Sequence, residues 1–396
     1  MLTIDTAQRR ARLQRRHGLV PSHPRTVAEA AAAIVVVHAT DPATVYLSLL
    51  ARCPEATLDD ISAALYEDRS LVKLIGMRRT MFVVPTDFAP VVHSAAGRAI
   101  AQRLRKQLLQ HLGTHRVEPP IDADLAAWLT DVEAGTERAV DARGEALASQ
   151  LSQDEPRLRT TLIPNGDKAY DVPIKLTSRV LTLMGADGRV VRGRPAGTWL
   201  SRQHRWASVR SLWPDGMPDL PESSAEEELV RRWLGAFGPA TVADLKWWTG
   251  WTLGTTRKVL ARLEVTEVGL DDEQEPGVVL SDDLEPEPPV PPAAVLLPAL
   301  DATPMGWQRR GWYLGPHQPA LFDRNGNIGP TVWWDGRIVG GWAIRDGEVV
   351  WRLLEDVGAE ASAAVAEVAG ALQPKLAGAS VIPSFRTPLE RELVES

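Results

Sequence analysis

The 396-residue sequence predicts an α+β protein made of tandem winged-helix (helix-turn-helix) domains and a C-terminal antiparallel β-rich domain. Three stretches of the chain repeat one order of apolar patterns: a short helix, a turn, a second helix and an extended segment. Further along, Asn325-Gly326, Asp335-Gly336 and Asp346-Gly347 separate short β-rich runs at intervals of about ten residues. Such dipeptides favour tight turns, so their regular spacing indicates an antiparallel meander.

The chain is longer than one hydrophobic core usually supports, so several domains are expected. We place a basic N-terminal segment at 1–24, winged helices at 25–116, 120–215 and 222–268, an acidic Pro-rich linker or loop at 270–293, and a β-meander domain with a C-terminal helix and tail at 294–396. The net charge is -7, yet residues 1–116 carry 16 Lys+Arg against 9 Asp+Glu. A chain with this polarity can present a cationic face to phosphates while remaining acidic as a whole.

The first winged helix rests on the segment from Thr57 to Pro85. Thr57 and Asp60 have the spacing of a capping box, and apolar residues follow at helical intervals. "YEDRS" is predicted to be a turn, and the apolar residues of "LVKLI" to mark a second helix. "TMFVVP" is predicted to be a strand that Pro85 stops.

The second and third units follow the same order. In the second, "IDADLAAWLTDVEAG" is predicted to be a helix ended by its glycine, and Asp187-Gly188 to turn a hairpin after another helix. In the third, Thr241 and Asp244 again have the capping spacing, and Gly250 ends that helix. A further helix is expected from about Thr255 to Leu263.

A break in the helical pattern at His38–Asp41 indicates a candidate site. The apolar run Ala28–Val37 is helix-forming, but polar side chains interrupt it at His38, Thr40 and Asp41. Pro42 fits the first turn of a new helix, which makes Asp41 the expected N-cap. His38 and Thr40 therefore lie at a helix-to-helix junction, where an extended segment would point both side chains the same way.

Several segments resemble the bacterial winged-helix DNA glycosylases of the AlkZ/YcaQ type. The resemblance runs in order from about residue 25 to 360 and is carried by "AAAIVVVHATDPATVYLSLLAR", "LVKLIGMRRTMFVVP", "RRWLGAFGPATVADLKWWTGW", "LLPALDATPMGWQRRGWYL" and "LFDRNGNIGPTVWWDGRIVGGW". It implies tandem winged helices arranged around a DNA channel. It also implies excision of alkylated (N3/N7) purines, including bulky genotoxin adducts in some members, in base excision repair or self-resistance.

The resemblance also implies which residues carry the chemistry. The family's signature is a glutamine, an apolar residue and a second polar residue (usually Gln, or Asp) directly before a "DPRAVYL"-like sequence. His38 and Thr40 occupy the two polar positions here, so this chain departs from the pattern at both, and Asp41 supports the site. A neutral imidazole can accept a proton from water, and a hydroxyl can hold that water from the other side. Activity should then fall as the pH drops through the histidine pKa.

The predicted DNA contacts are mostly basic residues, which elsewhere also form solvated faces. We expect them at Lys73, Arg78, Arg79, Arg189, Arg192 and Arg194 of the first two units, and at Arg309, Arg310 and Trp312 in the loop "GWQRRGWYLG". Basic residues of this kind bind phosphates without reading sequence.

Other classes of function find little support. The histidines have no metal-ligand spacing, the chain has one cysteine and no phosphate-binding glycine loop, and no cofactor is expected. The sequence has no long apolar run or secretion signal, so we expect a cytoplasmic monomer that meets no membrane. The expected partner is double-stranded DNA carrying alkylated bases. Two alternatives stay open: a catalytically inactive winged-helix DNA-binding protein (a lesion binder or regulator), and a scaffold whose winged helices bind proteins.

Overall fold

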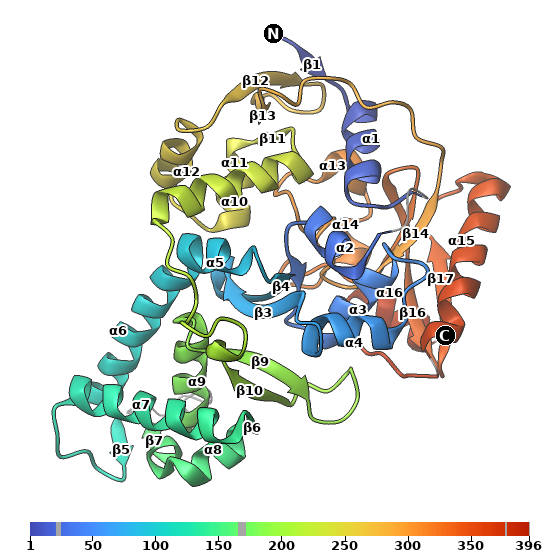
Figure 1. The fold of residues 1–396 in the computed structure, drawn as a ribbon. Helices are drawn as coiled ribbons and strands as arrows, with labels where there is room; N and C mark the ends of the chain where they lie inside the picture. The colour runs from blue at the N-terminus through green and yellow to red at the C-terminus, as the bar shows by residue number, and fades with distance from the viewer. Residues whose placement is uncertain (21–24, 165–171, 377, 396) are drawn as a thin grey trace. The chain divides into compact units, whose positions relative to one another are not determined.

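A computed structural model describes residues 1–20, 25–164, 172–376 and 378–395 of the chain (Figure 1). The chain divides into two compact units. Unit 1 comprises Met1–Leu71, Phe82–Pro85 and Glu226–Ser396, and unit 2 comprises Val72–Met81 and Thr86–Ala225. Among the described residues, no helix is both long and apolar enough to cross a membrane.

Three segments of the described chain share one element order: a helix, a short strand, two helices and two strands. The first has α2 (Val27–Ala33), β2 (Val37–His38), α3 (Pro42–Leu50), α4 (Leu58–Tyr66), β3 (Leu71–Gly76) and β4 (Thr80–Pro85). The second has α7 (Leu125–Arg143), β6 (Glu145–Leu147), α8 (Ala148–Asp154), α9 (Leu176–Ala186), β9 (Val190–Pro195) and β10 (His204–Ser208), with two strands of another sheet inserted between α8 and α9. The third has α10 (Glu222–Phe237), β11 (Ala240–Thr241), α11 (Val242–Thr249), α12 (Leu253–Leu260), β12 (Val265–Leu270) and β13 (Gly277–Leu280).

The sheets of these segments are also ordered alike. The strand orders are β2-β4-β3, β6-β10-β9 and β11-β13-β12, so the first strand always pairs with the last. In the third sheet, β1 (Thr3–Ile4) adds to the outer edge of β12 in parallel. The short first strand of each segment was not anticipated, because two or three residues carry too little periodicity to be recognised in a sequence.

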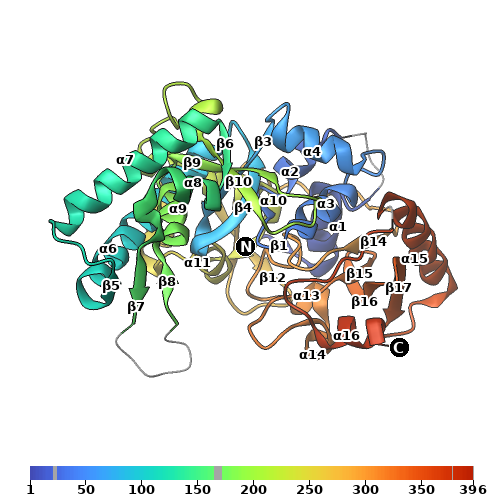
Figure 2. The same ribbon diagram turned by 90° about the horizontal axis from the view of Figure 1, so that it is seen from below.

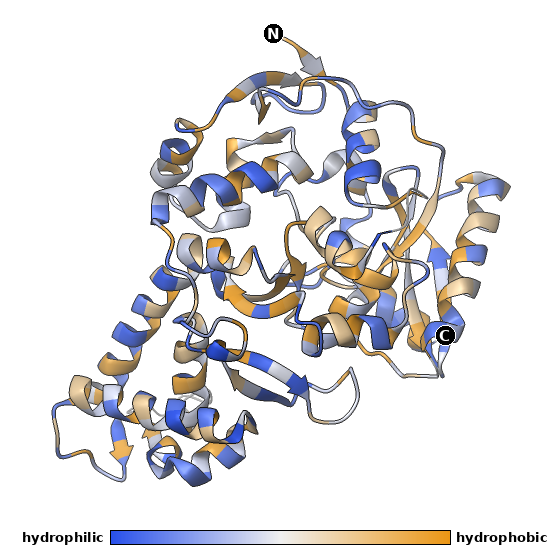
Figure 3. Ribbon diagram, in the orientation of Figure 1, coloured by the Kyte–Doolittle hydropathy of each residue, from blue (hydrophilic) through white to orange (hydrophobic). Residues whose placement is uncertain are grey.

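One element of the first segment differs from its prediction. The predicted second helix over "LVKLI" is wrong, because Leu71–Gly76 forms the strand β3. A short apolar run fits a buried strand as well as a helix, and here Val72 and Ile75 are β-branched. The strand at "TMFVVP" is confirmed as β4, and so is the capping box of Thr57 and Asp60. Both strands are mostly hydrophobic along their length (Figure 3).

Two glycine predictions in the second segment also fail. Helix α7 continues through Gly135 and ends at Gly144, whose φ is 70°. Gly135 permits a close approach instead, because a Cβ there would collide with the side chain of Glu155. Asp187 and Gly188 end α9 rather than turning a hairpin. In the third segment, the Thr241/Asp244 capping box and the left-handed Gly250 are confirmed.

Unit 2 contains several further elements. They are α5 (Ala89–Val92), α6 (Arg98–Thr114), and a small sheet of order β5-β7-β8 formed by Arg116–Glu118, Thr161–Ile163 and Ile174–Lys175. Helices α6 and α9 are in contact.

The basic N-terminal segment and the acidic stretch at 270–293 pair with each other. Helix α1 (Thr6–Arg16) forms ion pairs of Arg9 with Asp272, of Arg12 and Arg16 with Asp283, and of Arg15 with Glu287, with N–O distances between 2.6 and 3.2 Å. The acidic stretch also contains β13, which is fully buried. The stretch is therefore mostly a loop, with one buried strand, that pairs with α1, and most of the positive charge of α1 is neutralised within unit 1.

The C-terminal part of unit 1 is the predicted meander. Strands β14 (Ala294–Leu297), β15 (Thr331–Trp334), β16 (Arg337–Arg345) and β17 (Glu348–Leu353) pair antiparallel in chain order. Asp335-Gly336 and Asp346-Gly347 make the two tight turns, with positive φ at all four residues. Helix α15 (Gly358–Leu372) packs beside the sheet (Figure 2), and the predicted extended tail instead contains α16 (Pro388–Glu395).

Candidate functional site

The chain enters the candidate site through a strained turn. The helix-forming apolar run extends to Val37, but helix α2 ends at Ala33. The helix cannot continue further because Val35 adopts a φ of 64°. The amide of Val36 donates to the carbonyl oxygen of Ile34 at 2.6 Å, which closes a three-residue γ-turn. Val35 is β-branched and 2% exposed, so this backbone conformation is unfavourable and is held by the surrounding core. The turn redirects the chain from helix into strand.

Strand β2 then fixes the backbone of His38. Val37 pairs with Val83 and His38 with Phe82 of β4. Side chains alternate across a strand, so Val37 is fully buried whereas His38 is half-buried. The imidazole meets the ring of Phe82 edge-on, with 5.6 Å between centroids, and its Nδ1 is buried. Thr40, beyond the end of the strand, is exposed.

Asp41 is the predicted N-cap of α3, and both of its carboxylate oxygens accept hydrogen bonds. The amide of Ala43 donates to Oδ1 at 3.1 Å, and the amide of Ser384 donates to Oδ2 at 2.6 Å. Pro42 occupies the first helical turn, as expected. Asp41 therefore starts the helix and also ties it to the C-terminal segment, which the sequence could not indicate.

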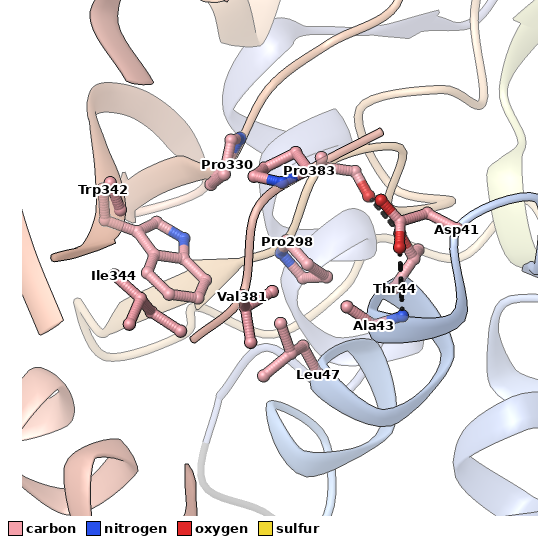
Figure 4. A pocket seen from close by; sticks show the side chains of 12 residues that line it. Asp41, Ala43, Thr44, Leu47, Pro298, Pro330, Trp342, Ile344, Val381 and Pro383 are labelled. Atoms are coloured by element: carbon pink, nitrogen blue, oxygen red, sulfur yellow. Dashed lines mark hydrogen bonds between the residues drawn. The ribbon is translucent and has the colours of Figure 1, made fainter. Parts of the chain in front are cut away.

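A small hollow of about 20 Å³ lies on the other side of Asp41 (Figure 4). Its walls are mostly apolar and include Leu47, Trp342 and Ile344. The hydroxyl of Thr44 also faces it but already donates to the carbonyl of Ala299 at 2.8 Å. Neither His38 nor Thr40 lines this hollow, so it is separate from the predicted chemistry and offers no polar group to carry a reaction.

The far end of α3 is anchored by a buried ion pair. Arg52 makes a two-point contact with Asp301, with both N–O distances 2.8 Å, and neither side chain is exposed. Ser48 donates to the same carboxylate at 2.6 Å, and Arg52 donates to Thr303 as well. Burial raises the pKa of Asp301, but Arg52 and these hydrogen bonds outweigh it and lower the pKa overall. Asp301 is thus held as a carboxylate.

His17 completes this buried cluster. Its Nδ1 lies 2.9 Å from the Thr303 hydroxyl, and its Nε2 lies 3.1 Å from the carbonyl oxygen of Ala236. Burial, with the nearby charge of Arg52, lowers the pKa of His17 to about 3. The imidazole is therefore neutral in the folded protein. Arg52, Asp301 and His17 were not singled out from the sequence, because their partners are far apart in the chain.

The predicted DNA contacts of unit 2 have different environments. Arg189 forms ion pairs with Glu133 and Glu137, so its charge is already matched. Arg192 lies over the ring of Trp206 at 4.1 Å, and its guanidinium is 2.8 Å from Nδ1 of His204. Burial, and then the charge of Arg192, lowers the pKa of Lys73 to about 8.

The other predicted DNA contacts of unit 2 are Arg78, Arg79 and Arg194. Arg78 and Arg79 are exposed at the tip of the β3–β4 hairpin, both with positive φ, and Arg194 is half-buried.

The loop "GWQRRGWYLG" packs differently from its prediction. Trp312 is 4% exposed, and Arg9 lies 4.2 Å from its ring, so Trp312 belongs to the core and offers no face to a base. Arg309 forms ion pairs with Glu273 and Glu275. Arg310 donates to the carbonyl of Trp307 and stacks on Trp247 and Phe322. The arginines of this loop are therefore engaged within unit 1. Among the described residues, no group of His, Cys, Asp and Glu side chains has the arrangement of a metal site.

Comparisons with known proteins agree with this architecture. The profile of a family described as "DNA glycosylase AlkZ-like" matches residues 31–374. Among solved structures, the DNA glycosylase AlkZ of Streptomyces sahachiroi matches with a TM-score of 0.70 and 20% sequence identity, over 96% of this chain and 99% of that chain. No curated protein sequence matches this one. At this identity the structural likeness establishes a shared fold.

Proposed function

The chain belongs to the AlkZ-like DNA glycosylase family, and from this premise we propose that it hydrolyses the N-glycosidic bond of alkylated purines in double-stranded DNA. The proposed substrates are N3- or N7-alkylated bases, including bulky adducts. His38 and Thr40 are the proposed site residues, and the reaction is a monofunctional hydrolysis in which water is the nucleophile.

The observation that carries the proposal is the state of the polar groups at the start of α3. Of the three polar residues in this segment, Asp41 is buried, whereas His38 is half-buried and Thr40 is exposed. His38 and Thr40 are also the residues that stand at the family's two polar positions. They occupy a junction whose backbone is held by β2 on one side and by the capped helix on the other.

The proposed reaction needs little acid catalysis from His38 and Thr40. An N3- or N7-alkylated purine is cationic and leaves readily, so the reaction needs a positioned water and a site that tolerates an oxocarbenium-like sugar. With Nδ1 of His38 buried, Nε2 is the nitrogen that would accept a proton from this water. The Thr40 hydroxyl can hold the same water.

Asp41 contributes through its charge. The N-terminal end of α3 carries positive partial charge, which would oppose a developing cation. The Asp41 carboxylate sits directly on that end, 3.1 Å from the amide of Ala43. The carboxylate therefore offsets the helix end and favours positive charge nearby.

We also propose that the three repeated segments are tandem winged helices. The order helix, strand, two helices and two strands, with the first strand beside the last, is that of a winged helix and supports the assignment. Such domains commonly bind duplex DNA, and Arg78 and Arg79 at the tip of the first hairpin are accessible to phosphates.

The test is base release from duplex DNA containing N7-methylguanine, measured for the natural protein, His38→Ala and Thr40→Ala. We expect release by the natural protein and a loss in both variants, with binding to the same duplex retained. His317→Ala is the matched control, because His317 is half-buried in the same unit but lies outside the site segment. Variants that release base as fast as the natural protein would refute the site assignment.

The departure from the family's polar pattern at both positions favours a second candidate function. A protein that retained the fold but lost the catalytic pair would bind lesions or regulate DNA without cleaving the bond. Binding without release by the natural protein, across N3-methyladenine, N7-methylguanine and a bulky N7 adduct, would support this candidate over the glycosylase.

A further inference from the structure

Unit 2 contains a basic hollow that was not predicted from any sequence motif. The hollow has a volume of about 150 Å³ and lies where α6 and α9 meet the tip of the β3–β4 hairpin. Its polar lining consists of Arg79, Gln107, His111, Ser178, Arg179 and Thr182. No aspartate or glutamate lines it within the described part of the chain.

The two arginines of this hollow have no charged or hydrogen-bonding partner among the described residues. Across the described residues, neither Arg79 nor Arg179 makes a hydrogen bond or an ion pair. Elsewhere in the same unit, Arg105 and Arg189 share the buried carboxylate of Glu133. Two unmatched positive charges in one concave site repel each other and favour an anion between them.

The available donors suit an oxygen-rich anion. The hydroxyls of Ser178 and Thr182 already donate to backbone carbonyls, Thr182 at 2.7 Å. The donors left for a ligand are therefore the two guanidiniums, the Gln107 amide and one nitrogen of His111. Burial, the neighbouring His115 and Arg179 all lower the pKa of His111, so its neutral ring donates through a single N–H. Guanidinium groups match phosphate oxygens in geometry as well as charge.

The backbone at Arg79 is a second, independent observation. Arg78 and Arg79 are the two central residues of the hairpin turn, with φ values of 54° and 59°. Asn-Gly or Gly-Gly relaxes such a turn, whereas arginine is strained there. Backbone strain of this kind is often found at functional residues, which suggests that the Arg79 side chain has a function.

We propose that this hollow binds one phosphate of a DNA strand, with Arg79 and Arg179 on its oxygens. This inference rests on the proposed function, because it takes duplex DNA as the partner. Leu104, Leu108 and Ile174 form the apolar part of the lining. They can pack against the sugars on either side of the phosphate. A backbone phosphodiester therefore fits it better than free phosphate does.

The experiment measures binding of a fluorescein-labelled, undamaged duplex by anisotropy over a series of salt concentrations. The proteins are the natural chain, Arg79→Gln, Arg179→Gln and the double variant, each checked for folding by circular dichroism. Loss of charge-assisted hydrogen bonds should weaken binding roughly ten-fold or more in the double variant. The slope of log affinity against log salt should fall by about one unit, because one phosphate contact is lost.

Two features separate this site from general electrostatics. Because both arginines hold one phosphate, the single substitutions should be non-additive. Lys106→Gln is the matched control, since it removes one exposed charge from α6 outside the hollow and should have a smaller effect. A double variant that binds DNA as tightly as Lys106→Gln would overturn the proposal.

Inorganic phosphate, titrated at constant ionic strength, distinguishes the two sources of the anion. If phosphate stabilises the natural protein but not the double variant, while all variants bind DNA equally, the hollow takes free phosphate and the DNA assignment is wrong. The assay uses undamaged DNA, so failure of base release leaves this test intact.

Discussion

The two ends of α3 hold polar groups in opposite environments. At the C-terminal end, Arg52 and Asp301 are fully buried and their hydrogen bonds are shared with Ser48 and Thr303. At the N-terminal end, His38 is half-buried and Thr40 is exposed.

The two ends of α3 therefore have different roles, one structural and the other proposed to be catalytic. The buried cluster has its carboxylate and its guanidinium fully engaged, so it fixes the helix and reaches no substrate. The N-terminal end carries the half-buried imidazole of His38 and the exposed hydroxyl of Thr40. The same helix therefore carries a structural polar group at one end and the proposed reactive groups at the other.

The largest effect should come from breaking the anchor. Asp301→Ala leaves the Arg52 guanidinium buried without its carboxylate, which should lower the free energy of unfolding by about 3–5 kcal/mol. Urea denaturation measures this change. Glu392→Ala, which removes an exposed ion pair with Arg352, is the control and should cost less than about 1 kcal/mol. Equal losses in the two variants would show that the cluster is not an anchor.

The next effect is a pH dependence of the unfolding free energy that comes from His17, in the buried cluster at the C-terminal end of α3. The pKa of His17 is about 3 in the folded protein and near 6.5 in the unfolded chain. The neutral imidazole therefore stabilises the folded protein fully above pH 6.5, and this stabilisation is lost as the pH falls toward 3. His17→Gln lacks this proton linkage. The difference in unfolding free energy between the natural protein and His17→Gln should narrow by about 2 kcal/mol from pH 7 to pH 5. Parallel stability curves would contradict the assignment.

A smaller effect is expected at the reactive end, from the residue that supports it. Asp41→Ala removes the cap of α3 and the acceptor of the Ser384 amide, at a cost of about 1–2 kcal/mol. Hydrogen exchange at Ser384 should become faster, whereas Asp41→Asn, which can still cap, should retain more protection. Unchanged exchange in Asp41→Ala would mean that the tie to the C-terminal segment is unimportant.

The smallest effect concerns the strained turn. Val35 and Val36 are each 2% exposed, so replacing either by glycine removes similar buried surface. Val35→Gly also relieves the positive φ, so it should destabilise the protein by about 1 kcal/mol less than Val36→Gly. Unfolding free energies of the two variants, compared directly, decide this. An equal cost would show that the turn is not strained.

Features set by neighbouring residues could be predicted from the sequence. The Asp41 cap, the capping box at Thr57 and the turns at Asp335-Gly336 and Asp346-Gly347 each depend on a few adjacent residues. The strand β3 was mistaken for a helix because its six residues satisfy both patterns, and sheet pairing decided between them.

Features set by distant residues could not be predicted. Arg52 and Asp301 are 249 positions apart, and the acidic partners of α1 lie more than 250 positions away. The charge count of the N-terminal region therefore suggested a cationic face, although the arginines of α1 are largely paired within unit 1. Likewise, nothing local distinguishes the paired Arg189 from the unpaired Arg79.

The most direct test of the central claim is a double-mutant cycle on base release under single-turnover conditions, with His38→Ala, Thr40→Val and the double variant acting on an N7-methylguanine duplex. Groups that position one water act as a unit, so we expect the double variant to be no slower than the slower single variant. Rate losses that multiply would show that the two side chains act independently, and the proposed shared water would be wrong.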